Sequence, residues 1–261
     1  MNQHPAGLPG AETLPLRRIF RQGGQEESSR SLPAEHHLDV WINGLHTLRL
    51  VCTPCCLEEL VLGRLYTEGM IASPEEVASL TLSPDGTQAQ VTLRREALPE
   101  TEPFAETIPT SGAGKLLHGR FAPDRPLKPL SPIPWRAEWI FAMADALDEG
   151  LPLYAATRAI HSCFLCREGQ ICCRQEDLGR HNAVDKVVGQ ALREGIDLGQ
   201  TVLYTSGRVP TDMVTKVIRA GIPVLASKAA PTGRAVQLAR EYGLTLLGSA
   251  RRDQMDLYWP R

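Results

Sequence analysis

The C-terminal part of the chain alternates short apolar segments with helix-like segments, and this alternation restricts the fold more than any other feature of the sequence. Apolar segments at 201–207, 222–227 and 244–250 are separated by segments of helical pattern at 210–221 and 230–243. Strands and helices that alternate in this way form a sheet with parallel strands joined by right-handed crossovers. We therefore expect an α/β fold, with helices flanking a sheet.

Proline content and polar composition divide the chain into four segments. Residues 1–37 are rich in Gly, Pro, Gln, Glu and Ser, which is typical of a flexible leader. Residues 121–134 contain five prolines, which cannot join a central strand or a helix interior. We interpret this stretch as a linker between an N-terminal α+β lobe at 38–120 and an α/β lobe at 135–261, which we expect to bind a cofactor.

Turn and cap residues predict the local elements. Hairpins are expected around Asn43-Gly44 and around Pro84-Asp85-Gly86. Between them, Thr53 suits a helix N-cap, Pro54 the first helical position and Gly69 the helix end. In the second lobe the pattern predicts a helix at 135–150, a hairpin at 161–176 and a helix at 182–193 that Asn182 caps.

The charge balance and the cysteine count exclude several classes of protein. The chain has 28 Lys and Arg against 30 Asp and Glu, which gives a net charge of −2. A nucleic-acid binder or a polybasic membrane binder needs an excess of basic residues. Seven cysteines, an odd number, do not suit a secreted disulfide framework. With neither a signal-peptide pattern nor an apolar stretch of about 20 residues, we expect a cytoplasmic protein.

Three glycine-rich or basic turns follow the three predicted strands. They are Thr205–Arg208 after the first strand, Ser227-Lys228 and 230–234 after the second, and Gly248–Asp253 after the third. Ligands of open α/β sheets bind beyond the carboxyl ends of the strands, where helix N-termini and arginines favour anions. Any one of these turns is equally explained by ordinary turn and cap chemistry. The three together predict a pocket for a phosphate or pyrophosphate.

A dense polar run, Glu176–Asn182, precedes the helix predicted at 182–193. His181 and Asp185 are four residues apart on that helix, and a carboxylate in this position can orient a histidine for proton transfer. The alternative is a capping and salt-bridge cluster. We favour a functional role, and the predicted pocket residues are Arg180, His181, Asn182, Asp185, Lys186, Ser206, Gly207 and Arg208.

Four cysteines lie in the hairpin predicted at 161–176. Paired cysteines are typical of zinc or iron–sulfur sites. Because side chains alternate along a strand, Cys163 and Cys172 would share one face and Cys166 and Cys173 the other. We therefore expect buried cysteines without a metal, although a loop in place of the hairpin would reopen the question.

Cys55 and Cys56 follow Thr53-Pro54 in the first turn of a predicted helix. The helix dipole at this position can lower the pKa of a thiol and make it nucleophilic. Core packing explains one of the two cysteines, and we expect the other to be available for reaction.

Several segments resemble the formate dehydrogenase accessory sulfurtransferase family. They are EDLGRHNAVDKVVG, YTSGRVPTDMVTKV, SKAAPTGRAVQLAREYGLTLLGSAR and DLYW in the second lobe, and VWINGLHTLRLVCTPCCLEELVLGRLYTEGMI in the first. The resemblance implies a homodimer with a cytidine-deaminase-like mixed sheet, flanking helices and a smaller N-terminal α+β lobe. It also implies binding of the molybdenum bis(molybdopterin guanine dinucleotide) cofactor as a client. Sulfur would pass from a cysteine desulfurase to this cofactor before its insertion into formate dehydrogenase.

The resemblance also implies roles for particular residues. The cofactor-binding stretch of the family matches Ser249, Ala250, Arg251, Arg252, Asp253 and Gln254, with Ser249 where an aromatic residue is usual. The family's Cys-Gly-x-Cys-Gly loop matches 109–115 here, and this segment contains no cysteine. A hydroxyl cannot form a persulfide, so no catalytic residue is transferred from the family.

Two functions follow from this departure. In the first, the chain is a sulfurtransferase with a relocated thiol, for which Cys55, Cys56, Cys163 and Cys166 are the candidates. In the second, the chain is a non-catalytic chaperone that binds the molybdenum cofactor. A zinc deaminase is set aside because the sequence lacks the His-x-Glu pair and the Pro-Cys-x-x-Cys run of those enzymes.

Overall fold

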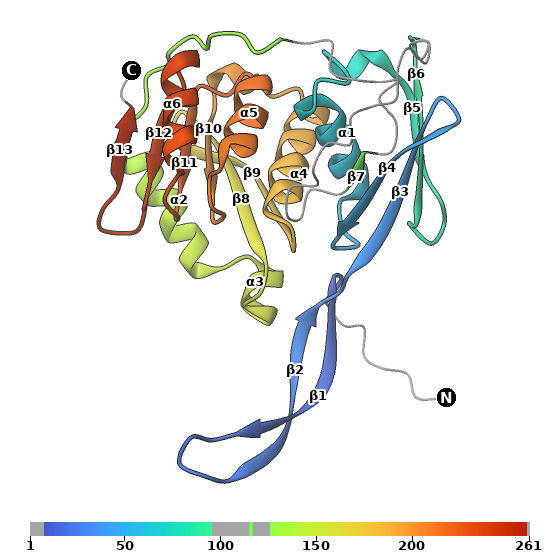
Figure 1. Cartoon of the computed structure of the whole chain (residues 1–261), viewed down its shortest axis with the longest axis vertical. Helices are drawn as coiled ribbons and strands as arrows, with labels where there is room; N and C mark the ends of the chain where they lie inside the picture. Colours follow the sequence, from blue (N-terminus) through green and yellow to red (C-terminus); the bar gives the residue numbers. More distant parts are fainter. Residues whose placement is uncertain (1–7, 96–114, 117–125, 260–261) are drawn as a thin grey trace.

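The computed structural model describes residues 8–95, 115–116 and 126–259. In this part of the chain two lobes lie side by side, and a narrow β-ribbon projects away from them (Figure 1). The C-terminal lobe contains a six-stranded sheet and the N-terminal lobe a five-stranded sheet. This mixed α/β architecture confirms the predicted fold class.

The six-stranded sheet is mixed. Its strands are β8 (His161–Arg167), β9 (Gln170–Asp177), β10 (Val202–Thr205), β11 (Val224–Ser227), β12 (Thr245–Gly248) and β13 (Asp256–Trp259). Their order is β13-β12-β11-β10-β8-β9. The three strands β10, β11 and β12 run parallel, as predicted, whereas the other pairings are antiparallel. The sequence pattern did not predict the edge strand β13.

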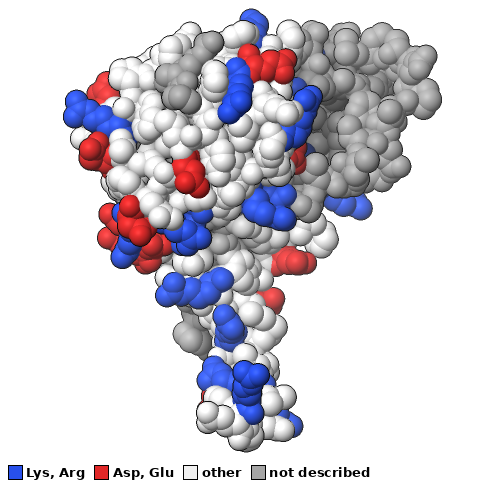
Figure 2. Space-filling model, turned by 60° about the vertical axis from the view of Figure 1, so that its left-hand side comes forward, with Lys and Arg blue, Asp and Glu red and all other residues white. Residues whose placement is uncertain are grey.

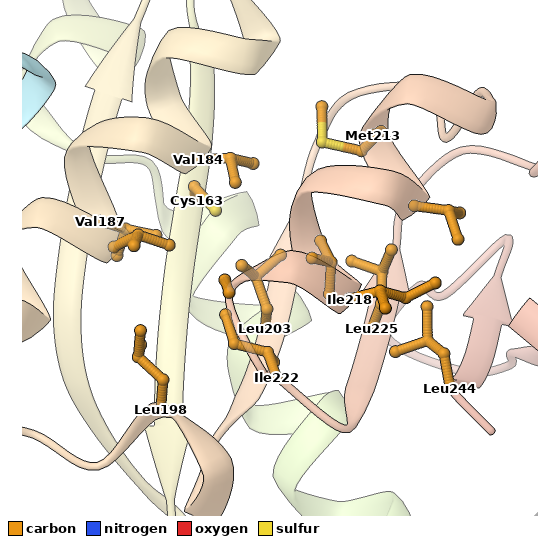
Figure 3. Packing of buried hydrophobic residues seen from close by; sticks show 14 of the residues in the cluster. Cys163, Val184, Val187, Leu198, Leu203, Met213, Ile218, Ile222, Leu225 and Leu244 are labelled. Atoms are coloured by element: carbon orange, nitrogen blue, oxygen red, sulfur yellow. The ribbon is translucent and has the colours of Figure 1, made fainter. Parts of the chain in front are cut away.

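Helices cover both faces of this sheet. They are α2 (Ala137–Glu149), α3 (Pro152–Thr157), α4 (Arg180–Arg193), α5 (Thr211–Arg219) and α6 (Gly233–Tyr242). On one face, Val187 of α4 and Met213 of α5 belong to the same buried cluster as Leu203 of β10 (Figure 3). On the other face, Met143 of α2 belongs to a second cluster with Tyr204. Because side chains alternate along β10, this strand contributes Leu203 to one core and Tyr204 to the other.

The N-terminal lobe combines a sheet with one helix. Its elements are β3 (His36–Ile42), β4 (Leu45–Cys52), α1 (Leu57–Thr67), the 3-10 turn Pro74–Glu76, β5 (Val77–Leu82), β6 (Gln88–Leu93) and β7 (Lys115–Leu116). The strand order is β5-β6-β3-β4-β7. Asn43 and Gly44 both have positive φ, at 47° and 78°, which is the geometry of a type I′ hairpin turn. Both hairpins predicted in this lobe are confirmed.

The prediction of a flexible leader over 1–37 is wrong for 11–33. This segment forms the projecting ribbon, in which β1 (Ala11–Ile19) pairs antiparallel with β2 (Gln25–Pro33). Its polar composition reflects solvent exposure, because most residues of both strands are exposed, and the projecting part carries basic side chains in the view of Figure 2. Cross-strand contacts such as the 2.8 Å ion pair between Arg17 and Glu27 accompany the backbone pairing.

Two helix starts differ from the prediction because tertiary contacts use the expected capping residues. Helix α1 begins at Leu57 with Cys56 as its N-cap, and Thr53 instead bonds to Asp177 of β9. Helix α4 begins at Arg180, two residues before Asn182, whose side chain donates to the carbonyl of Val51 instead. The caps were therefore misplaced where a polar side chain had a partner in the other lobe.

Helices α1 and α4 hold the two lobes together through a close crossing of two glycines. A Cβ atom on Gly63 would lie 1.7 Å from the carbonyl oxygen of Asp185, and one on Gly189 would lie 1.9 Å from that of Glu59. Each distance is too short for any side chain. The glycines thus permit a backbone approach that places the polar residues of α4 against the N-terminal lobe.

Part of the proline-rich stretch is described, from residue 126 onward. Residues 126–136 have no regular secondary structure, and the backbone N–H of Leu130 donates to the carbonyl of Tyr242 at 2.8 Å. This segment therefore runs along the C-terminal lobe. Among the described residues, no helix is long and apolar enough to cross a membrane.

Candidate functional site

The turns after β10, β11 and β12 lie at one edge of the six-stranded sheet, as predicted. The hydroxyl of Ser227 donates to the carbonyl of Gly207 at 2.7 Å, and the N–H of Lys228 donates to the carbonyl of Thr205 at 3.0 Å. The N–H of Ala250 in turn donates to the carbonyl of Ser227 at 2.9 Å. Hydrogen bonds therefore link the three turns side by side, at the carboxyl ends of the parallel strands.

Ser206 contacts a histidine that the predicted pocket did not include. The Oγ atom of Ser206 accepts from the N–H of Ser162 at 3.1 Å and lies 3.2 Å from Nδ1 of His161. His161 begins β8, and the antiparallel pairing of β8 with β10 places Cys163 opposite Thr205. The strand register, which the sequence alone did not provide, is what brings His161 to this edge.

Two arginines give this edge a positive potential. Arg208 is exposed, and the half-buried Arg180 is the first residue of α4. Burial lowers the pKa of Arg180, the nearby charge of Arg208 lowers it further, and the carboxylate of Asp212 acts in the opposite direction. Burial also lowers the pKa of His161, followed by the charge of Arg180. Positively charged side chains that lie near one another favour the binding of an anion between them. We call His161, Arg180, Ser206 and Arg208 the cationic edge.

Gly207 leaves space for the side chain of Arg180. A Cβ atom on Gly207 would lie 2.7 Å from Cβ and 3.1 Å from Cδ of Arg180. The predicted pocket residues Arg180, Ser206, Gly207 and Arg208 are therefore neighbours. Helices α4 and α5 both begin near them, and helix N-termini add to the attraction for an anion.

His181 does not interact with Asp185 as predicted. Its side chain is fully buried, and Nε2 lies 3.0 Å from Oδ2 of Asp212 on α5. Asp185 lies on the side of α4 that contacts the N-terminal lobe, with α1 and Lys216 as its partners. Although the two residues are one turn apart on α4, each side chain has its partner on a different element, so they do not pair with each other.

Asn182 and Lys186 bind the N-terminal lobe instead of lining the cationic edge. The Nζ atom of Lys186 lies 2.7 Å from Oδ2 of Asp177 and donates to Oγ1 of Thr53 at 2.8 Å. The amide of Asn182 donates to Val51 at 2.7 Å and to Asp177 at 2.9 Å. All these contacts are internal and both side chains are buried. Their predicted role in the pocket is therefore corrected to one of joining the lobes.

Asp185 has a similar role in a second buried cluster. Its carboxylate accepts from Lys216 at 2.8 Å and from Thr67 at 2.6 Å, and it lies 3.6 Å from Arg64. Lys216 also lies 3.0 Å from Glu68. The prediction for Asp185 is corrected in the same way, because it forms a buried ion-pair cluster across the lobe interface.

The stretch from Ser249 to Gln254 follows β12 beside the cationic edge. Ala250 is buried, and its carbonyl accepts from the hydroxyl of Tyr204 at 2.8 Å. Arg252 pairs with Asp148 of α2 at 3.1 Å. The exposed residues of this turn, which a ligand can reach, are Arg251, Arg252, Asp253 and Gln254.

The cysteine hairpin differs from its predicted register by one residue. Cys166 pairs with Ile171, but Cys173 pairs with Leu165 because a β-bulge inserts one extra residue in β9. Cys173 therefore lies in the same buried cluster as Cys163, and Cys166 lies in the cluster on the other face. In the described part of the chain, no three Cys, His, Asp or Glu side chains form a group that could hold a metal.

The four candidate sulfur-carrying cysteines divide into two pairs. Cys163 and Cys166 are buried in the core, and burial raises the pKa of both thiols. Cys55 is half-buried and Cys56 is exposed. Burial raises the pKa of Cys55, whereas a helix dipole was expected to lower it. Cys55 lies before the N-cap of α1 and therefore outside the first turn of the helix. Of the segment matched to the family's cysteine loop, residues 109–114 lie outside the described residues.

Comparisons with known proteins agree on one family. A model described as the FdhD/NarQ family matches residues 33–261. A protein of Geobacillus kaustophilus named sulfur carrier protein FdhD is 31% identical over 241 residues, covering 92% of each chain. The protein of the same name from Bacillus subtilis is 29% identical over 241 residues, with the same coverage. A crystal structure of a formate dehydrogenase accessory protein from Desulfotalea psychrophila, 25% identical, superposes with a TM-score of 0.78 over 97% of this chain and 98% of that one.

Proposed function

Because the chain belongs to the FdhD/NarQ family, we propose that it serves the maturation of a formate dehydrogenase or a related molybdoenzyme. Its client is the molybdenum bis(molybdopterin guanine dinucleotide) cofactor, held through its phosphates at the cationic edge. Sulfur reaches this cofactor from a cysteine desulfurase by way of the protein, which acts as a homodimer. The single observation that supports the binding step is the convergence of Arg180 and Arg208 beside two helix starts and three linked turns.

The chain's own residues bind and orient the client. Arg208 is exposed and can form charge-assisted, bidentate hydrogen bonds to a phosphate. Arg180 adds a second guanidinium that Gly207 leaves room for. Ser206 and His161 supply polar atoms at the floor of the same edge. An anion bound there reduces the repulsion between the two arginines and adds to the effect of Asp212 on Arg180.

A titration with GDP tests the binding step, because GDP contains the base and the pyrophosphate of the client. We expect wild-type protein to bind GDP in calorimetry at low ionic strength and to bind it more weakly as salt is added. Arg208→Gln should weaken binding about tenfold, the size expected for losing one charged hydrogen bond.

Arg167→Gln is the matched control for this titration. Arg167 is exposed like Arg208 but lies at the opposite end of β8 from His161. It should bind GDP as wild type does. If Arg208→Gln and Arg167→Gln bind equally well, or if wild type binds no guanine nucleotide, the cationic edge is not the cofactor site.

A second candidate function is a non-catalytic chaperone for the same cofactor. The absence of cysteine from 109–115 and the burial of Cys163 and Cys166 favour it. It shares the GDP-binding step with the first proposal but excludes persulfide formation. A sulfur-loading experiment therefore separates the two.

A further inference from the structure

A cavity beside the cationic edge contains two adjacent thiols. It has a volume of about 310 Å³ and is lined by the ribbon base, the segment before α1, the start of α3 and β9. Its lining includes Cys55, Cys56 and Glu176. Apolar side chains such as Leu151 and Leu153 form part of the wall. Four separate segments of the chain therefore meet around one cysteine pair.

The segment before α1 is held rigidly in place. Thr53 donates to Asp177 through both its N–H and its hydroxyl, at 3.0 Å each, and accepts from Lys186 at 2.8 Å. The N–H of Cys55 then donates back to the carbonyl of Thr53 at 2.8 Å. The buried ion pair at the lobe interface thus fixes the position of the thiols.

Cys56 has an unusual backbone conformation. Its φ of 52° and ψ of 46° lie in the left-handed region, where glycine or asparagine is usual. This conformation costs a non-glycine residue about 1–2 kcal/mol. Cys56 is nevertheless exposed, so core packing does not explain the choice of cysteine. Cys55, in contrast, packs with its sulfur 3.2 Å from the position of a Cβ atom on Gly10.

The cavity is next to the proposed cofactor site. Glu176 accepts from the N–H groups of Leu153 and Tyr154 at 2.9 Å, and from the hydroxyl of Ser162 at 3.4 Å. The N–H of Ser162 donates to Ser206, a member of the cationic edge. A single residue, Ser162, therefore links the cavity wall to the edge by hydrogen bonds.

From this geometry we infer that Cys56 is the thiol that accepts sulfane sulfur, and that the cavity shelters the resulting persulfide. This inference rests on the proposed function, which supplies a protein cysteine persulfide as donor. The inference assigns to Cys56 the sulfur-accepting role that a thiol of the cysteine loop would otherwise have.

The transfer is a balanced exchange without net oxidation. The thiolate of Cys56 attacks the terminal sulfur of the donor persulfide and forms a new S–S bond. The S–S bond of the donor breaks, and the donor cysteine leaves as a thiolate that takes up a proton from water. Arg174 lines the same cavity and provides positive charge for the persulfide anion. Leu151 and Leu153 place apolar surface on the wall of the same cavity.

Sulfur loading tests this inference on the full chain. The protein is incubated with a cysteine desulfurase and isotope-labelled cysteine, alkylated and digested with trypsin. Cleavage after Arg49 and Arg64 releases one peptide that contains Cys52, Cys55 and Cys56. Fragment ions between the two adjacent cysteines then locate the extra sulfur. We expect it on Cys56.

Three variants complete the experiment. Cys56→Ser should lose the label, whereas Cys55→Ser should keep it on Cys56. Cys172→Ser is the matched control, a half-buried cysteine that does not line the cavity, and it should load as wild type does. Circular dichroism and GDP binding establish that each variant is folded.

The outcomes separate this inference from the proposed function. Label on any other cysteine, or no label from a desulfurase that visibly carries its own persulfide, overturns the role of Cys56. If the protein still binds GDP in that case, the cofactor-binding proposal stands. If Cys56 loads but no guanine nucleotide binds, the cationic edge fails as the cofactor site and the sulfur site remains.

Discussion

The polar run at the start of α4 serves two regions with opposite environments. Arg180 joins the cationic edge, where it lies beside the exposed Arg208. Asn182, Asp185 and Lys186 point into the lobe interface, where buried partners satisfy them. The same residue types thus form the edge where we propose anion binding in one place and join two lobes in the other.

The contrast between the two regions shows that a high density of charged residues in a sequence does not by itself indicate a binding site. Both regions contain basic residues next to hydrogen-bonding groups. At the interface the two buried lysines have counter-ions, Asp177 for Lys186 and Asp185 for Lys216. At the cationic edge, burial and the charge of Arg208 lower the pKa of Arg180 while Asp212 opposes them, and a bound external anion would raise this pKa further.

The largest expected effect is from Lys186→Met. Removing this lysine leaves the carboxylate of Asp177 buried without its counter-ion, which typically costs about 3–5 kcal/mol. We expect this loss in the free energy of unfolding measured with urea. Lys228→Met is the control, since Lys228 pairs with Asp148 at 2.8 Å in a partly exposed position and should cost less than about 1 kcal/mol. Equal losses would show that the buried pair does not hold the lobes.

Gly189→Ala tests the helix crossing that creates the interface. The added methyl group would meet the carbonyl of Glu59, and overpacking of this kind costs about 1–3 kcal/mol or more. Gly233→Ala is the matched control because nothing lies within 4 Å of its added Cβ atom. A thermal melt should show a much lower Tm for Gly189→Ala only. A Tm unchanged by Gly189→Ala would contradict the close approach of α1 and α4.

Acid should weaken the interface through Glu68. Burial alone would raise the pKa of this carboxyl, but Lys216 and Arg64 lower it to about 2 from an ordinary 4.5. A carboxyl whose pKa is lowered on folding stabilises the folded state at every pH above its pKa in the unfolded chain. This stability is lost as the pH falls from about 4.5 to about 2. We expect Glu68→Gln to flatten the dependence of unfolding free energy on pH in this window. An unchanged slope would assign the acid sensitivity to other carboxylates.

The smallest effect on stability, with a clear effect on binding, is expected at the cationic edge. Gly207→Ala would displace the side chain of Arg180 and should cost roughly 1 kcal/mol of unfolding free energy. GDP binding should weaken while the lobe interface stays intact. Comparing the urea midpoint with calorimetric affinity checks both. If Gly207→Ala binds GDP normally, Arg180 does not contribute to the site.

Much of the fold could be predicted because its signals are local. The Asn43-Gly44 hairpin and the β10 to β12 strands follow from turn chemistry and from runs of apolar residues. The ribbon at 11–33 was missed because most of its residues are exposed to solvent, so its strands lack the sustained apolar alternation of a half-buried strand. The β-bulge in β9 was missed because nothing in the sequence specifies a one-residue insertion.

The candidate site could be predicted only in part. Arg180, Ser206, Gly207 and Arg208 were found because strand ends and helix starts define one edge of a parallel sheet. His161 was missed because only the antiparallel pairing of β8 with β10 brings it there.

Sequence alone was enough to predict the alternation of β10, α5, β11, α6 and β12, the family and the edge at which three turns converge. Periodicity, turn residues and helix starts depend on neighbours along the chain, so they can be interpreted without a structure. Only the tertiary structure decided which polar residues face the solvent. Lys186 meets Thr53 across 133 positions and Asp185 meets Thr67 across 118. Contacts at such separations depend on how α4 packs against α1, and that packing distinguishes a buried ion pair from a binding site.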